Sequence, residues 1–129
     1  MKKKRKVLIV DDDPAALGLL GAILARRGLE IVSFADPASA LEGLKADRAD
    51  LVISDLMMPK MDGIRFMTLA REIRPKLPVI LITGNATVAT AVSAMQWGAF
   101  DYLKKPYEIA KVREIVGRAI ESLETGQAA

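Results

Sequence analysis

The sequence predicts an α/β fold in which helices cover both faces of a parallel sheet. Short apolar runs of strand length alternate five times with segments of helical periodicity along the 129 residues. Hydrophobic residues make up 51% of the chain, yet only one tryptophan, two tyrosines and three phenylalanines are present, so aliphatic side chains must fill the core. Strands that alternate with helices of this length imply right-handed crossovers, so we expect one (βα)5 domain.

The five predicted strands are the apolar runs at residues 7–10, 31–34, 51–53, 79–82 and 100–103. Asp13-Pro14 and Asp36-Pro37 each place a capping residue before a proline at the first helical position, which predicts the starts of two helices. Asp62-Gly63 opens the third helix, while Gly28 and Gly98 end the first and the fourth.

The last helix is amphipathic and ends the predicted domain. Its apolar stripe consists of Ile109, Val112, Val116, Ala119 and Leu123. We therefore divide the chain into a basic lead-in at residues 1–6, a domain at residues 7–123, and a tail or start of a linker at residues 124–129.

The charge of +3 comes from the lead-in, because Lys2 to Lys6 are five consecutive basic residues and the rest of the chain is slightly acidic. We expect this run to be solvated, and we expect no direct nucleic-acid binding by the domain. The apolar run after it ends at once in three aspartates and no membrane-length stretch follows, which predicts a cytoplasmic protein with no membrane association. The chain has no cysteine and no histidine, which excludes disulfides, thiolate zinc sites and histidine bases.

Polar side chains follow four of the predicted strands. Asp11 and Asp12 follow the first strand, Asp55 the third, Thr83 the fourth and Lys105 the fifth. In open α/β sheets ligands bind beyond the carboxyl ends of the strands, so these five residues should share one pocket. Each of them has an ordinary structural explanation when it is taken alone. Their convergence is the argument for a site.

The predicted cluster suggests metal-assisted phosphoryl chemistry. Two carboxylates about 4 Å apart repel by roughly 4 kcal/mol at an effective dielectric constant near 20, so three of them require a cation. With oxygen ligands in an open site, magnesium (Mg2+) is the natural choice. One carboxylate can act as the nucleophile and become an aspartyl phosphate, whose oxygens Thr83 is placed to meet.

The motifs together resemble the receiver domains of two-component response regulators over essentially the whole chain. The matching segments are residues 7–14 (VLIVDDDP), 55–59 (DLMMP), 61–63 (MDG), 83–84 (TG) and 105–106 (KP). The resemblance implies a flavodoxin-like doubly wound fold with strand order 2-1-3-4-5.

By this resemblance, Asp55 is the phosphoacceptor. Asp11 and Asp12 hold Mg2+ together with Asp55, and the backbone carbonyl of Met57 completes the protein ligands. The donor would be a phosphohistidine on a sensor histidine kinase or on a phosphotransfer protein, since this chain has no histidine. The resemblance implies a signalling domain that assists its own phosphorylation and dephosphorylation and is not an enzyme.

The resemblance also implies a switch. Thr83 and Tyr102 form the switch pair, while Lys105 contacts the phosphoryl group and precedes a cis peptide bond at Pro106. The face made by the fourth helix, the fifth strand and the fifth helix would change shape and act on an output domain or partner protein. Trp97, at the end of the fourth helix, is expected to sense that change. Residues 83–107 look like receivers of the nitrogen-regulation type, which implies transcription regulation and allows a homodimer.

Three alternatives remain. A haloacid-dehalogenase-like phosphohydrolase would use Asp11 as nucleophile and Asp13 as acid-base, but it leaves Asp55 without a role. A flavodoxin-like nucleotide or flavin binder lacks a phosphate loop after the first strand, where Asp11 and Asp12 would repel an anion. A pseudo-receiver that uses only its surface does not need the complete set of acceptor residues.

Overall fold

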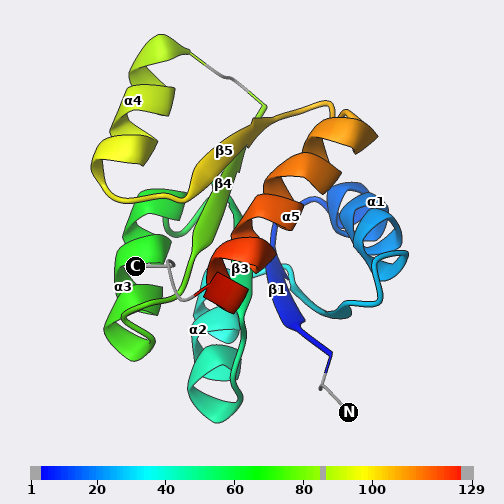
Figure 1. Ribbon diagram of the computed structural model, residues 1–129. Helices are drawn as coiled ribbons and strands as arrows, with labels where there is room; N and C mark the ends of the chain where they lie inside the picture. Colours follow the sequence, from blue (N-terminus) through cyan, green and yellow to red (C-terminus); the bar gives the residue numbers. More distant parts are fainter. Residues whose placement is uncertain (1–3, 85–86, 126–129) are drawn as a thin grey trace.

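The computed structural model describes residues 4–84 and 87–125, which form five parallel strands and five helices (Figure 1). The elements are β1 (Lys6–Val10), α1 (Pro14–Ala25), β2 (Glu30–Phe34), α2 (Pro37–Ala46), β3 (Leu51–Asp55), α3 (Gly63–Ile73), β4 (Val79–Thr83), α4 (Val88–Gln96), β5 (Asp101–Lys104) and α5 (Ile109–Thr125). The strand order is β2-β1-β3-β4-β5, which confirms the predicted doubly wound fold.

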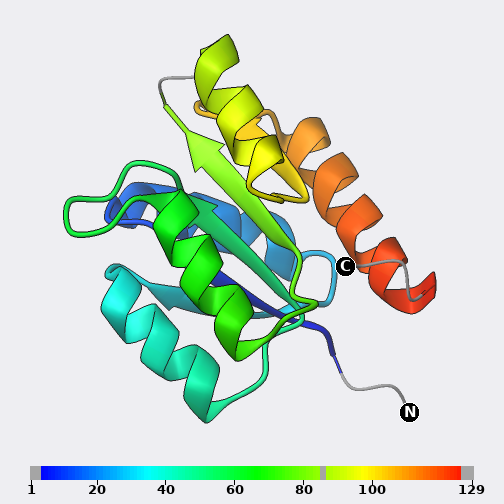
Figure 2. The same cartoon turned by 90° about the vertical axis from the view of Figure 1, so that its left-hand side faces the viewer.

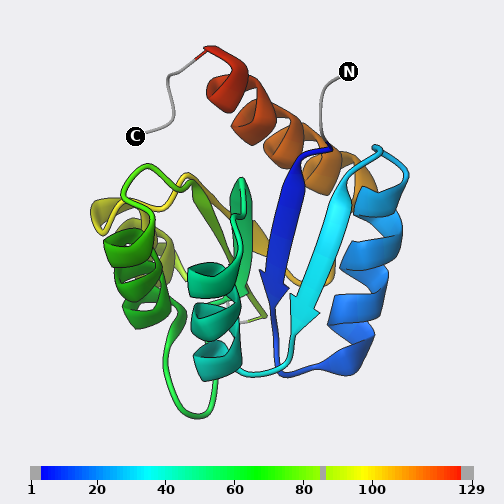
Figure 3. The same ribbon diagram turned by 90° about the horizontal axis from the view of Figure 1, so that it is seen from below.

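Two apolar clusters hold the helices against the two faces of the sheet. One cluster joins the sheet to α1 and α5, and the other joins it to α2, α3 and α4. Figure 2 shows α2, α3 and α4 in front of the sheet with α1 behind it, and Figure 3 shows the sheet between these layers. Both faces of the central strands are therefore covered, which explains why every residue of β3 and β4 is buried and why their apolar residues follow one another without alternation.

The predicted helix boundaries are confirmed by their caps. Asp13, Asp36 and Asp62 each accept a hydrogen bond from a backbone N–H in the first turn of the helix that follows. Gly28 and Gly98 have φ angles of 72° and 98°, a left-handed conformation that side chains other than glycine adopt at a cost.

The strand ends differ by one or two residues from the sequence prediction, and two differences have a physical reason. Strand β5 begins at Asp101 rather than at residue 100, because backbone pairing with β4 starts at Asp101. Phe100 packs instead against the apolar cluster between the sheet and helices α1 and α5. The buried stripe of α5 begins at Val112 rather than at Ile109, since Ile109 is 50% exposed, and it includes Ile115, which was not predicted.

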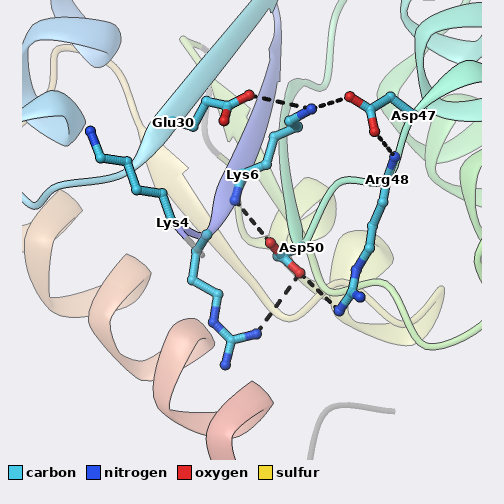
Figure 4. Close-up of a pocket in the computed structure, with 7 residues that line it drawn as sticks. Lys4, Lys6, Glu30, Asp47, Arg48 and Asp50 are labelled. Atoms are coloured by element: carbon cyan, nitrogen blue, oxygen red, sulfur yellow. Dashed lines mark hydrogen bonds and ion pairs between the residues drawn. The ribbon is translucent and has the colours of Figure 1, made fainter. Parts of the chain in front are cut away.

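Two of the three described residues of the basic lead-in, Arg5 and Lys6, form ion pairs, whereas Lys4 is exposed and has no ion pair among the described residues (Figure 4). Lys6 belongs to β1, and its ammonium contacts Asp47 and lies 3.3 Å from Glu30. Arg5 lies 3.9 Å from Asp50, which also accepts the backbone N–H of Lys6 at 2.8 Å. Lys2 and Lys3, and residues 126–129 of the predicted tail, lie outside the described residues.

Candidate functional site

Three carboxylates meet at the carboxyl edge of the sheet. Strands β1 and β3 are parallel neighbours with Val10 opposite Ser54, so the next residues, Asp11 and Asp55, come level with each other. Asp12 follows directly, and one oxygen from each of the three side chains lies within 4.8 Å of the other two. The predicted acidic cluster is thus present, and the register of two strands explains it.

The carboxylates differ in exposure. Asp11 is fully buried and Asp55 is 6% exposed, whereas Asp12 is open to solvent. Burial raises the pKa of Asp11, and the nearby charge of Asp55 raises it further, although the N–H of Asp13 and the ammonium of Lys105 oppose the shift. Asp11 and Asp55 therefore form the buried part of the cluster, and Asp12 forms its solvent-exposed part.

Lys105 reaches into this cluster from the end of β5. Its Nζ lies 2.9 Å from Oδ2 of Asp11 and 3.2 Å from Oδ2 of Asp55. Burial alone would lower the pKa of Lys105, but contact with these two carboxylates outweighs burial and raises the pKa above its usual range. The ammonium thus supplies the positive charge that the carboxylates require.

Backbone amides fix the other oxygens. Oδ1 of Asp11 accepts the N–H of Asp13 at 3.0 Å, and Oδ1 of Asp55 accepts the N–H of Met57 at 3.1 Å. The N–H of Met57 is thereby placed beside the cluster, while the residue as a whole is 66% exposed. The role of its carbonyl as a metal ligand stays a prediction. Asp13 caps α1 through its own side chain, which confirms its structural assignment.

A close contact behind Asp55 was not predicted. Gly63, the first residue of α3, donates its N–H to the carbonyl of Leu56 at 2.7 Å. A Cβ at Gly63 would lie 2.5 Å from the carbonyl oxygen of Asp55 and 2.7 Å from Cα of Leu56. The sequence signal at this position is Asp62-Gly63, which predicts a helix start and belongs to the MDG segment of the resemblance, but neither observation predicts the close approach to Asp55.

The predicted switch residues share one face of the sheet. Thr83 ends β4 and is buried, and its position is two residues after Leu81, which pairs with Tyr102. Side chains two residues apart on a strand point to the same face. Tyr102 is half-buried and packs against the cluster under α2, α3 and α4. Thr83 and Tyr102 therefore both face this layer.

Tyr107 is a second residue that sequence reasoning missed. Its ring packs against the apolar cluster between the sheet and helices α1 and α5, and its hydroxyl is buried without a hydrogen-bond partner among the described residues. Burial raises the pKa of this hydroxyl, and the negative charges of Asp11 and Asp55 act in the same direction. The peptide bond between Lys105 and Pro106, just before it, is cis as expected.

The donor set fits a hard divalent cation. Apart from its ion pair with Lys105, Oδ2 of Asp11 has no hydrogen-bond partner among residues 4–84 and 87–125, although it is buried. Three carboxylates this close, with one at the solvent rim, are ligands suited to magnesium.

A hollow lies at the opposite edge of the sheet, but its side chains suggest no reaction. This hollow of about 790 Å³ lies at the amino edge of the sheet, lined by residues such as Lys4, Lys6, Asp47 and Asp50, and most of its charges are paired with one another (Figure 4). Within the described residues, no helix has the length and apolar character needed to cross a membrane.

Comparisons with known proteins agree with this geometry. The profile of the response regulator receiver domain matches residues 7–117. The DNA-binding transcriptional regulator NtrC of Escherichia coli is 40% identical over 121 residues, which are 94% of this chain and 26% of that protein. The chain thus spans about a quarter of the length of this curated relative.

Solved structures give the same result. A CheY-like receiver domain protein from Methanospirillum hungatei superposes with a TM-score of 0.89 at 27% identity, covering 96% of this chain and 99% of that one. The beryllofluoride-activated NtrC4 receiver domain dimer superposes with a TM-score of 0.86 at 32% identity, covering 91% of this chain and 97% of that one. Nothing in these comparisons supports the phosphohydrolase alternative. The chain belongs to the family of response regulator receiver domains, and within it resembles those of NtrC-type regulators.

Proposed function

We propose that this chain is a phosphorylation-controlled switch in which Asp55 accepts a phosphoryl group. The observation that carries the proposal is the position of Asp55, which is level with Asp11 at the edge of the sheet and within 3.2 Å of the ammonium of Lys105. The Asp55 carboxylate attacks the phosphorus of a phosphohistidine on a sensor histidine kinase or phosphotransfer protein. The P–N bond breaks, the imidazole leaves, and an aspartyl phosphate forms.

The residues around Asp55 have separate tasks in this reaction. Asp11, Asp12, Asp55 and the carbonyl of Met57 would hold Mg2+, which supplies positive charge for the phosphoryl oxygens when it is bound. The N–H of Met57 holds one oxygen of Asp55, so the carboxylate is oriented before the donor arrives. The ammonium of Lys105 already contacts the carboxylate of Asp55, so it is placed to contact the negative oxygens of the new phosphoryl group.

The switch would pass from Thr83 to the surface made by α4, β5 and α5. A phosphoryl group on Asp55 offers acceptor oxygens to the Thr83 hydroxyl, and Tyr102 lies on the same face of the sheet. The exposed apolar side chains of α4, Val92 and Met95, together with Trp97, give this surface a part that can bind protein.

The output is proposed from the relatives. NtrC is described as a DNA-binding transcriptional regulator, so we infer that this domain controls transcription through an output domain or partner, and does not bind nucleic acid itself. The NtrC4 receiver is described as a dimer in its activated form, which supports a homodimer here. The proposed location is the cytoplasm, where a sensor kinase would supply the phosphoryl group, and the proposed role is signalling rather than enzymatic turnover.

Acetyl phosphate with Mg2+ tests the phosphoacceptor. Intact-mass measurement and peptide mapping should find one phosphoryl group, on Asp55, and Asp55→Asn should remove it. Label on Asp11, or label that persists in Asp55→Asn, would replace this proposal with the phosphohydrolase reaction.

A further inference from the structure

Helix α4 is attached to the domain mainly at its carboxyl end. Among the side chains of α4 that the structure describes, only Ala94, in the second half of the helix, is fully buried. The amino end is capped within itself, since Thr87 and Thr90 bond to each other through side chains and backbone. The turn after the helix is tied down, because Phe100 donates its N–H to Val79 at the start of β4.

Arg71 of α3 lies against this turn. Its Nε donates to the carbonyl of Leu77 at 3.2 Å, which fixes the guanidinium between α3 and the start of β4. From there the guanidinium packs so closely on Gly98 that a Cβ on this residue would collide with Nη1 of Arg71. Figures 1 and 3 show the turn after α4 beside α3. A residue with a side chain would therefore displace the arginine, and Gly98 also has a positive φ of 98°.

The guanidinium of Arg71 is partly desolvated, a cost that negative partial charge nearby would offset. Burial lowers the pKa of Arg71, and none of the ion pairs found among the described residues involves it. The carboxyl end of a helix carries partial negative charge, and Gly98 directly follows Trp97, the C-cap of α4. The partly buried guanidinium thus lies beside the negative end of the helix dipole.

We propose that Arg71 is a positioning residue that clamps the carboxyl end of α4, so that the switch tilts the amino end of the helix about a fixed point at Gly98. This proposal rests on the proposed phosphorylation of Asp55 as the trigger. The amino end joins Thr83 through residues 84–87 and has no fully buried side chain among those described, so it is the end that can move. The clamp turns a local change at Thr83 into a rotation of the exposed face of α4.

Amide hydrogen exchange on the wild-type chain, without any substitution, gives the first test. With beryllofluoride and Mg2+, exchange should change at Thr90 and Ala91, near the amino end, and stay within about twofold at Trp97, Gly98 and Ala99. Equal changes at both ends would overturn the clamp. Modification of Asp55 is followed separately by acetyl phosphate labelling, so that failure of the trigger is distinguished from failure of the clamp.

Arg71→Ala gives the second test, without any phosphodonor. The amides of Trp97, Gly98 and Ala99, which bond to Ser93, Met95 and Ala94, should exchange about tenfold faster than in the wild type. Arg65→Ala is the matched control, since it removes an exposed arginine from the same helix and should leave these amides unchanged. Unchanged exchange in Arg71→Ala, or an equal acceleration in Arg65→Ala, would refute the clamp.

A double-mutant cycle isolates the contact itself. Gly98→Ala should increase the unfolding equilibrium constant more in the wild type than in Arg71→Ala, because the new Cβ displaces the guanidinium from the turn and this contact is already absent when the arginine is gone. The strain at positive φ is common to both backgrounds and cancels. Equal effects in the two backgrounds would show that Arg71 and Gly98 are not coupled.

Discussion

The ammonium of Lys105 lies 2.9 Å from Oδ2 of Asp11, a carboxylate that the fold buries completely. This ion pair joins the end of β5 to the end of β1, across β3 and β4. In the unmodified chain the lysine neutralises part of the charge that Mg2+ would neutralise, so we expect a bound metal to compete with the lysine for the same oxygens.

Lys105→Ala should lower the melting temperature in the absence of metal and increase the stabilisation that Mg2+ provides. Removing one partner of a buried ion pair leaves the other unpaired, and because Lys105 is partly exposed we expect a loss of about 2 kcal/mol without metal. Thermal melts in EDTA and in a Mg2+ titration measure both effects. Lys104→Ala, which removes the exposed neighbouring lysine, should show neither, and a Mg2+ response unchanged in Lys105→Ala would mean that the ammonium does not compete with the metal.

Asp12→Ala should melt a few degrees higher than the wild type without metal and should lose the response to Mg2+. Asp12 is the exposed member of the cluster, so its removal relieves repulsion without opening a cavity. The variant should keep its fold by circular dichroism but fail to be labelled by acetyl phosphate. A wild-type response to Mg2+ would remove Asp12 from the metal site.

Gly63→Ala should destabilise the domain by about 1–3 kcal/mol and slow the labelling of Asp55, because the new Cβ would meet backbone atoms of Asp55 and Leu56. Urea denaturation and labelling rates measure the two effects. Gly21→Ala in α1 is the matched control, since nothing lies within 4 Å of its added Cβ, and it should stabilise the domain by about 0.5–1 kcal/mol. Labelling at the wild-type rate in Gly63→Ala would show that this close contact does not position Asp55.

The sequence was sufficient for features that depend on local chemistry. The Asp-Pro pairs at the starts of α1 and α2 predicted their caps, and the five apolar runs predicted the strands, because caps and strand periodicity depend on neighbouring residues. The acidic cluster was also predictable, since parallel strands end at one edge and Asp11 and Asp55 lie at the carboxyl ends of adjacent strands. The strand order itself came from the resemblance.

The features that the sequence did not predict depend on distant partners. Lys6 looked like a solvated residue, but its partners, Glu30 and Asp47, are distant in the sequence and are brought together only by the sheet. The contact of Arg71 with Gly98 likewise joins two elements whose separation no local pattern encodes. A sequence pattern identifies which residues can cap or pair, whereas the packing of elements decides which of them meet.

Thr83→Ala should leave the modification of Asp55 intact but weaken its effect on the surface made by α4, β5 and α5. Asp55 should still be labelled, because the three carboxylates of the cluster stay intact, but no hydroxyl at position 83 would meet the phosphoryl oxygens. Trp97 provides the readout, since it is the only tryptophan, lies at the C-cap of α4 and is 61% exposed. Beryllofluoride with Mg2+ should shift its emission in the wild type and shift it less in Thr83→Ala. The clamp at Gly98 is expected to keep the backbone at the carboxyl end of α4 in place. A shift in Trp97 emission would therefore report rotation of α4 relative to β5. Emission that stays fixed while Asp55 is modified would show that the signal leaves by another face, or that Trp97 does not sense it.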